Sequence, residues 1–341
     1  MKFGLFGGAR SAGEGSVGDS LGYRNFIDYV LLAEELGYES VFVVEHHFTG
    51  VGQVSASLNL LTYLAARTRN IRLGTAVVVL PWHNPALLAE QVATIDLLSD
   101  GRFDFGVGKG YRDTEFDGFC VPMPEATERF EETMAFLREA WTAQGRFSHQ
   151  GKFWKFNNIV IEPRPTQLPH PPLWMGAGSF EGIKRAGESG YNLLLDQLAE
   201  TDLVGQRVAT YRAAVESQGR KIVPHSIGLT RALLLATTDE ERRKAYEVRH
   251  RTLKTIGGLA RGPGAERYKN IGTLADANIA NDDAALIGKP DEIVAKLKAL
   301  ESVGVDYVLL VDPTGSEEAL RVFAKEVMPA FKNAPAYLPA R

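Results

Sequence analysis

"IRLGTAVVVLPWHNPALLAEQVATIDLLSDGRFDFGVGKG", residues 71–110, begins and ends with apolar runs typical of strands buried in a parallel sheet. Between these runs Asn84 precedes Pro85, the residue types preferred at the N-cap and the first position of a helix. Gly101 is the expected end of that helix, and its buried stripe has helical spacing: Leu88, Val92, Ile95 and Leu98. The stretch therefore predicts one strand–helix–strand unit.

The same alternation continues along the rest of the chain. Helices follow the strands, the first of them expected from Tyr23 to Leu36. Eight strands are predicted, at residues 2–7, 40–47, 71–81, 103–110, 173–178, 191–197, 228–237 and 306–312. This number of units in 341 residues favours an α/β fold, a single-domain (β/α)8 TIM barrel with insertions, over an open doubly wound sheet. We expect one domain, residues 1–341, without an internal boundary.

Two long segments interrupt the alternation, at residues 145–172 and 260–288. The first is rich in aromatic residues and ends in prolines, and the second is polar and contains glycine. Loops of this length in a compact domain are usually functional or disordered. We therefore expect a lid over the barrel mouth, formed above all by residues 260–288, with a solvated excursion as the alternative.

Composition excludes several classes of protein. A net charge of −4, from 42 acidic and 38 basic residues, provides no basic field for nucleic acid or an anionic membrane. No apolar run reaches the roughly 18–20 residues of a membrane span, and the N-terminus lacks the apolar core of a signal peptide. The single cysteine, Cys120, cannot form an internal disulfide and has no histidine beside it. We expect a cytoplasmic globular protein in which Cys120 is not a nucleophile.

Three ionisable residues, Glu45, His46 and His47, follow directly on the apolar run of residues 41–44. They stand at the end of a predicted barrel strand, where active sites of such barrels form. Adjacent strand residues point to opposite faces, so both histidines cannot reach one ion, and no metal-binding spacing accompanies them. We therefore expect no metal here. One histidine is expected to act as a general acid–base or hydrogen-bond donor, and a histidine that only caps the strand is the alternative.

Two glycine-rich stretches have the chemistry of anion sites. In "GRFDFGVGKGY" (residues 101–111) the glycines allow a ligand close to the backbone, and Lys109 offers a charge for a phosphate. No helical pattern is apparent directly after it, so a dinucleotide-binding fingerprint is not expected. In "WMGAGSFEGIKRAG" (residues 174–187) Ser179 precedes a helix whose first amides can hold an anion. Together they suggest a phosphorylated ligand, with glycines for tight packing as the alternative.

These motifs occur in the order found in a known family. The chain resembles the bacterial luciferase-like flavin monooxygenases, most closely the luciferase α-subunit branch, through "MKFGLF", "EHHFT", "GTAVVVLP", "GRFDFGVGKGY", "GKPDEIVAKLKALESVGVD" and "FAKEVMPAF". The match spans nearly the whole length. The resemblance implies a TIM barrel, usually dimeric, that binds reduced FMN and reacts it with dioxygen.

The resemblance also implies roles for single residues at the barrel mouth. His46 corresponds to the catalytic histidine of the family. Phe6, Ala76 and Val77 correspond to positions that line the isoalloxazine ring, and the match of "GTAVVVLP" predicts a bulged strand with a non-proline cis peptide between Ala76 and Val77. On a regular strand Glu45 and His47 would point the other way and anchor the strand end through hydrogen bonds.

Other correspondences concern the phosphate of FMN. Lys109 stands where luciferase has a phosphate-binding arginine, which keeps the charge but loses the bidentate fork. Ser179 matches a second phosphate contact. Gly178, in the same loop, replaces a glutamate, so the detailed contacts of this part of the cofactor site stay open. Gly108 replaces the reactive cysteine of luciferase beside the flavin.

The function implied is a monooxygenase that uses reduced FMN and dioxygen to oxygenate a small, largely apolar carbonyl-type substrate. A separate NAD(P)H:flavin reductase would supply the reduced flavin, because no nicotinamide fingerprint is visible in this chain. A homodimer is expected. Two alternatives remain: a deazaflavin-dependent oxidoreductase of the same superfamily, and a flavin-binding relative without catalysis.

Overall fold

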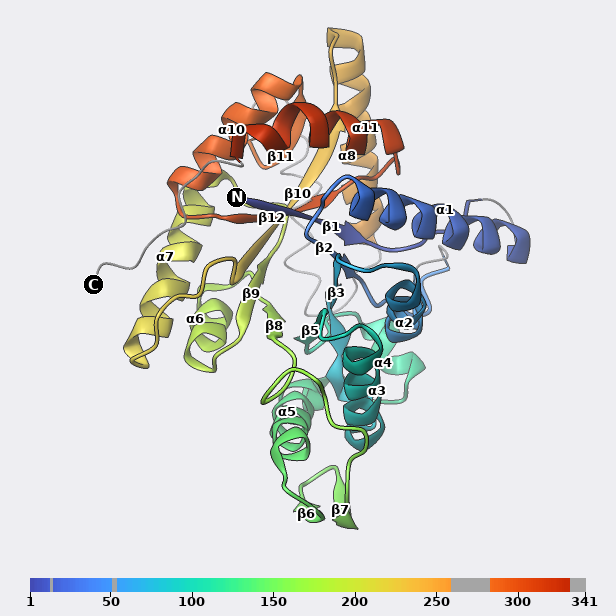
Figure 1. Ribbon diagram of the computed structural model, residues 1–341, viewed down its shortest axis with the longest axis vertical. Helices are drawn as coiled ribbons and strands as arrows, with labels where there is room; N and C mark the ends of the chain where they lie inside the picture. Colours follow the sequence, from blue (N-terminus) through green and yellow to red (C-terminus); the bar gives the residue numbers. More distant parts are fainter. Residues whose placement is uncertain (13–14, 51–53, 259–282, 332–341) are drawn as a thin grey trace.

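The computed structural model describes residues 1–12, 15–50, 54–258 and 283–331 (Figure 1). Eight parallel strands close into a barrel, because β9 pairs with β10 and completes the ring that runs through the other six. Their bounds are β1 Lys2–Gly7, β2 Ser40–Val43, β3 Arg72–Thr75, β5 Phe103–Gly108, β8 Leu173–Gly176, β9 Asn192–Leu195, β10 Ile227–Leu235 and β12 Tyr307–Val311. The predicted TIM barrel is confirmed.

Helices surround the barrel, as Figure 1 shows. They are α1 Gly15–Glu35, α2 Ser57–Arg67, α3 Pro85–Leu98, α5 Ala126–Thr142, α6 Phe180–Glu188, α7 Thr201–Ser217, α8 Asp239–Gly258, α10 Pro290–Ser302 and α11 Glu317–Val322. After α11 come a π-helical turn, Phe323–Val327, and a short 3-10 helix, Met328–Phe331. Asn84 caps α3 through hydrogen bonds from the backbone amides of Ala86 and Leu87, as the sequence predicted. Among the described helices none is long and apolar enough to cross a membrane.

Side chains alternate between two cores along each barrel strand. On β2, Val41 and Val43 are buried between the strands and the helices, in the larger hydrophobic cluster. Phe42 belongs instead to a smaller cluster inside the barrel, with Trp174, Leu194, Tyr307 and Leu309. The inner cluster fills the barrel, so a ligand can enter only at the mouth, where the C-terminal ends of the strands lie.

A one-residue bulge shapes the third barrel strand. The four steps from Gly74 to Val78 lie opposite only three steps from Asp104 to Val107 on β5. After the bulge the strand resumes as β4, Val78–Val79. The extra residue falls within the predicted bulged segment, and the peptide bond between Ala76 and Val77 is cis, as predicted.

A threonine hydroxyl closes the ladder across the bulge. The Oγ1 atom of Thr75 donates to the carbonyl oxygen of Gly106 at 2.7 Å and accepts from its amide at 2.8 Å. A Cβ added at Gly106 would overlap the carbonyl oxygen of Thr75, so only glycine allows this close approach of the two strands. The bonds satisfy a buried backbone pair that the bulge would otherwise leave without partners.

The first insertion is not a lid. Within it, β6 Phe147–Gln150 and β7 Lys155–Ile159 form an antiparallel hairpin. Glu132 of α5 accepts hydrogen bonds from the backbone amides at the hairpin turn, and Phe136 packs against Phe147 and Phe156. The hairpin therefore lies along α5, away from the strands in Figure 1. The segment follows a helix and precedes a strand, so its ends belong to the barrel end opposite the mouth.

The second insertion is shorter than the sequence indicated. Residues 285–288, expected in the loop, form strand β11, Ala285–Gly288, which pairs with residues 232–235 of β10. Their apolar side chains are buried. The predicted lid thus falls mainly on residues 259–282, which lie outside the described residues.

Candidate functional site

The predicted isoalloxazine contacts meet at one side of the barrel mouth. The ends of β1, β2 and β3 are neighbours there: the amide of Val44 donates to the carbonyl of Gly7 at 2.9 Å, and that of Ala76 to the carbonyl of Val43 at 2.8 Å. Phe6, Ala76 and Val77 are partly buried and pack together on top of the inner cluster. They form an apolar floor of the kind that a flat aromatic ring system requires.

Two strand-end glycines leave space around this floor. A Cβ added at Gly108 would lie 2.5 Å from Cγ2 of Val77, and one added at Gly176 would lie 3.6 Å from its Cγ1. Val77 therefore occupies the space that a larger side chain at Gly108 would need. This accounts for the glycine at the position where luciferase has a cysteine.

The two predicted phosphate contacts follow neighbouring strands. Val107 of β5 pairs with Met175 of β8, so Lys109 and Ser179 continue from adjacent strand ends at the mouth. Lys109 is exposed, and its Nζ donates to Oγ1 of Thr127 at the start of α5, at 3.2 Å. Ser179 is the N-cap of α6, where its Oγ accepts from the amide of Gly182 at 3.2 Å. A lysine and a helix N-terminus on adjacent strand ends suit a phosphate.

A carboxylate beside Gly178 was not predicted. A Cβ at Gly178 would lie 3.0 Å from Oδ2 of Asp196 and 3.8 Å from Nη2 of Arg207. Asp196 follows β9 and accepts from Arg207 of α7 at 3.2 Å. Gly178 thus leaves room for an ion pair next to the phosphate loop. The sequence gives no signal for it, because Arg207 belongs to an ordinary helical pattern.

The strand predicted over residues 40–47 ends at Val43, so His46 lies in the segment that follows β2. Its side chain is held by a partner from another element. Its Nδ1 lies 3.1 Å from Oε1 of Glu115, which is buried on α4, Asp113–Gly118. The same oxygen accepts from the backbone amide of His47 at 3.0 Å. The expectation that no helix begins directly after the glycine-rich stretch was wrong, because α4 begins at Asp113. A six-residue helix is too short for a readable periodicity.

The surroundings of His46 determine its protonation. Burial lowers the pKa of His46, although the hydrogen bond to Glu115 acts in the opposite direction. The neutral ring is therefore favoured near pH 7. Because Oε1 of Glu115 serves as an acceptor for the amide of His47, Nδ1 of His46 must be the donor, which leaves Nε2 without a hydrogen. His46 is thus arranged as a proton acceptor, more than as the donor that the sequence suggested.

Glu45 and His47 anchor the strand end, as predicted. Oε1 of Glu45 lies 3.1 Å from Nε2 of His47 and from Nε2 of His83, and it accepts from Nε1 of Trp82 at 3.1 Å. Burial alone would raise the pKa of Glu45, but the hydrogen bonds with His47 and His83 outweigh burial and lower it to about 2. Among the described residues no group of three or more His, Cys, Asp or Glu side chains could hold a metal ion.

Aromatic rings form the rim of the mouth beside this anchor. The ring of Phe119 stacks on Trp82 with centroids 5.1 Å apart and meets His47 edge-on at 4.7 Å. Phe48, which is exposed, lies 5.0 Å from Phe119. The entrance next to His46 is therefore largely apolar.

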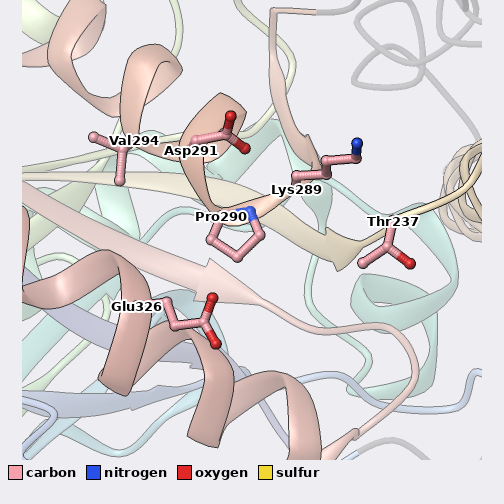
Figure 2. Close-up of a pocket in the computed structure, with 6 residues that line it drawn as sticks. All are labelled: Thr237, Lys289, Pro290, Asp291, Val294 and Glu326. Carbon is pink, nitrogen blue, oxygen red and sulfur yellow. The ribbon is translucent and has the colours of Figure 1, made fainter.

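A separate pocket of about 620 Å³ lies at α10 (Figure 2). Its lining comprises Thr237, Lys289, Pro290, Asp291, Val294 and Glu326. Figure 2 shows Glu326 facing it from the π-helical turn, across from Pro290 and Asp291 on α10. None of the predicted site residues belongs to this pocket. The candidate site is therefore assigned from the side chains gathered at the strand ends.

The barrel fold and the groups gathered at its mouth are those of a class of barrel oxidoreductases that bind flavins. The apolar floor fits the ring system, and Lys109 with the start of α6 fits the phosphate. The luciferase-like monooxygenase family model matches residues 1–307, so the chain belongs to that family.

Individual relatives agree with this membership. The chain is 27% identical to the oxygenase component of a flavin-dependent trigonelline monooxygenase from Acinetobacter baylyi, over 91% of this chain and 90% of that one. It is 27% identical to an FMNH2-dependent dimethylsulfone monooxygenase from Pseudomonas putida, over 89% and 86%. The crystal structure of monooxygenase RslO1 from Streptomyces bottropensis superimposes with a TM-score of 0.82 at 26% identity, covering 96% and 99%. The chain is thus similar over most of its length to flavin-dependent monooxygenases of this family.

The anchor predicts how stability depends on pH. The pKa of Glu45 is about 2 in the folded protein, against an ordinary value of 4.5. Because the folded value is the lower one, its contribution is complete above pH 4.5 and is lost as pH falls towards 2. Urea unfolding at pH 7 should show Glu45→Gln less stable than wild type by on the order of 3 kcal/mol.

This difference in the free energy of unfolding should shrink steadily between pH 4.5 and the lowest pH at which both proteins fold. Glu181→Gln, which removes an exposed carboxylate on α6, should follow the wild-type profile throughout. A difference for Glu45→Gln that does not depend on pH would contradict the assignment.

Proposed function

We propose that this chain is the oxygenase component of a two-component system, using reduced FMN and dioxygen to oxygenate a small, largely apolar carbonyl-type substrate. The observation that carries the proposal is the arrangement of one mouth, where the floor of Phe6, Ala76 and Val77 adjoins the strand that carries His46. The apolar rim favours an apolar substrate. A separate NAD(P)H:flavin reductase would supply the reduced flavin, as the name of the trigonelline relative suggests for that system.

Each group of residues at the mouth has a role in this proposal. When bound, the reduced flavin supplies the electrons that activate dioxygen. Phe6, Ala76 and Val77 would hold its ring, while Lys109 and the start of α6, with Gly178 and Ser179, would hold its phosphate. His46 would accept a hydrogen bond or a proton through Nε2 at the reacting end. The rim would exclude water from the site. The single cysteine is in keeping with a cytoplasmic location.

Mixing the protein with reduced FMN, dioxygen and a panel of small aldehydes, ketones and sulfones tests the function. Oxygenated product formed in proportion to the dioxygen consumed is the expected result. Cofactor extracted from the purified protein should show the absorbance spectrum of FMN, and a deazaflavin spectrum would favour the deazaflavin alternative. Binding of FMN without any product from the panel would favour a relative without catalysis.

Replacing His46 should separate oxygen consumption from oxygenation. His46→Ala should leave FMN affinity and thermal stability nearly unchanged, because the amide of His47 and the guanidinium of Arg112 still contact the carboxylate of Glu115. Product formation should fall on the order of 10²–10⁴-fold, the usual effect of losing a general acid–base group, while dioxygen is still consumed and released as hydrogen peroxide. Product and dioxygen are measured in the same reaction. An unchanged ratio of product to dioxygen in this variant would refute the role.

Removing the lysine charge should weaken cofactor binding. Lys109→Ala should reduce the binding free energy of FMN by roughly 1.5–3 kcal/mol, the range for a hydrogen bond to a charged group. Titration followed by flavin fluorescence measures it. Lys184→Ala, which removes an exposed charge farther along α6, should bind FMN as wild type does. Equal affinity for Lys109→Ala and wild type would remove Lys109 from the phosphate site.

We also propose that two copies of the chain associate through α2 and α3. Leu98, which the sequence placed in the buried stripe of α3, is instead exposed. The outer face of α3 carries no charge at four surface positions: Leu87, Gln91, Thr94 and Leu98. Tyr63 is exposed on α2, which packs beside α3. An uncharged helix face with exposed leucines suits a second copy of itself.

Light scattering should give twice the mass of the chain for the wild type. Leu98→Glu should give the mass of one chain, because two carboxylates would be buried across the symmetry axis. Leu168→Glu, at a leucine that is 85% exposed in the first insertion, serves as the control. A monomeric wild type, or a dimer that survives Leu98→Glu, would contradict this interface.

A further inference from the structure

Glu115 is the most completely buried carboxylate at the mouth besides the Glu45 anchor, and it belongs to an element the barrel does not require. Its side chain is 2% exposed. It lies on α4, which begins four residues after Lys109. Burying a carboxylate is costly unless every partner is well placed. The partners of Glu115 therefore indicate the structural role of its carboxylate.

All of the partners meet at one oxygen. Oε1 accepts from the amide of His47 at 3.0 Å and lies 3.1 Å from Nδ1 of His46 and 3.5 Å from Nη1 of Arg112. Arg112 is fully buried and places a positive charge beside this oxygen. A carboxylate needed only to tie down the strand end would be satisfied by the amide of His47. The contact with Nδ1 adds control over the orientation of the imidazole ring.

The helix that carries Glu115 is itself fixed. Phe116 is buried and meets the ring of Trp82 edge-on, with centroids 5.2 Å apart. A Cβ added at Gly110 would lie 2.9 Å from the ring of Phe116, so the loop and the helix are in tight contact. Because Trp82 is hydrogen-bonded to Glu45, α4 is packed against the anchor of the same strand end. The carboxylate of Glu115 therefore has little freedom to move away from His46.

We propose that Glu115 is the positioning residue for His46: it holds the ring through Nδ1 and so keeps Nε2 unprotonated and directed at the reacting groups. The charged groups that face His46 are Glu115 and Arg112 from the β5–α4 segment and Glu45 from its own strand. Only Glu115 among them is hydrogen-bonded to the ring. A neutral imidazole in solution can carry its hydrogen on either nitrogen, so this contact decides the form that is present. The catalytic consequence rests on the proposed function, whereas the choice of tautomer does not.

The tautomer can be observed directly by NMR on protein labelled with ¹⁵N-histidine. The chain has seven histidines, and the His46 signals are assigned by their loss in His46→Ala. Near pH 7 the wild-type ring should carry its hydrogen on Nδ1. In Glu115→Ala the Nε2-protonated form should become the main one. Glu45→Gln is the matched control: it removes a neighbouring buried charge that touches His47 but not His46, so the His46 tautomer should not change.

Reaction with reduced FMN then tests the consequence for catalysis. In Glu115→Ala the ratio of product to dioxygen should fall about 10- to 100-fold, the range for groups that orient a functional imidazole, with FMN affinity retained. Glu115→Gln keeps an acceptor for Nδ1 and should lie closer to wild type. Because it lacks the negative charge, His46 should become protonated only at a lower pH, so the acid-side loss of product should move to lower pH.

Several outcomes would overturn the proposal. They are a wild-type His46 that carries its hydrogen on Nε2, a tautomer that Glu115→Ala leaves unchanged, and an acid limb that does not move in Glu115→Gln. Should Glu115→Ala fail to fold, the titration of His46 in Glu115→Gln decides alone, and an unchanged titration refutes the role.

The two proposals fail in different ways. The NMR measurements need neither flavin nor substrate. A protein with the expected tautomers but no oxygenated product would contradict the proposed function and leave the positioning role standing. If Glu115→Ala and wild type formed product in the same ratio to dioxygen, the positioning role of Glu115 would be contradicted and the proposed function would stand.

Discussion

The double hydrogen bond between the hydroxyl of Thr75 and the backbone of Gly106 is the constraint on which the mouth depends. It lets one extra residue enter the third barrel strand without leaving a buried amide or carbonyl unpaired. The strand can then present Ala76 and Val77 to the interior above the inner cluster. The glycines at the ends of β5 and β8 keep free the space beside them. The floor of the site therefore depends on the hydrogen bonds between Thr75 and Gly106 as much as on the apolar side chains of Ala76 and Val77.

Two acid–imidazole pairs meet just after the end of β2, and they have different partners. Glu45 is surrounded by His47, His83 and Trp82, so this pair fixes the strand end. His46 meets a carboxylate that comes from another element. The carboxylate of the first pair is shared with His83 and Trp82, whereas the carboxylate of the second holds His46 through Nδ1. The same chemistry therefore fixes the strand end in one pair and joins it to α4 in the other.

Much of this could be predicted from the sequence, because strands with continuous apolar runs and a helix with Asn84 and Pro85 at its start are local signals. The positions of Phe6, Ala76, Val77 and His46 followed from a family resemblance. Contacts between distant segments could not be predicted: Glu115 lies 69 positions from His46 on a helix of six residues. Helix α1 begins at Gly15 and not at Tyr23. Gly22 lies inside this helix because it packs closely against the backbone of Arg10, a contact that the sequence does not reveal. The β6–β7 hairpin was expected to be part of a lid, because aromatic residues that pack against a helix such as α5 give the same sequence pattern as those that cover a barrel mouth.

The ion pair beside Gly178 restricts the order in which this site could change during evolution. A side chain at 178 would meet the carboxylate of Asp196, and an acidic one would also repel it. The glutamate that luciferase has in this loop would therefore be accommodated more easily once Asp196 had been replaced. That replacement would first leave Arg207 without its acidic partner. Each single step passes through a less favourable state, so the two positions are expected to be inherited together, and lineages that differ at one should differ at the other.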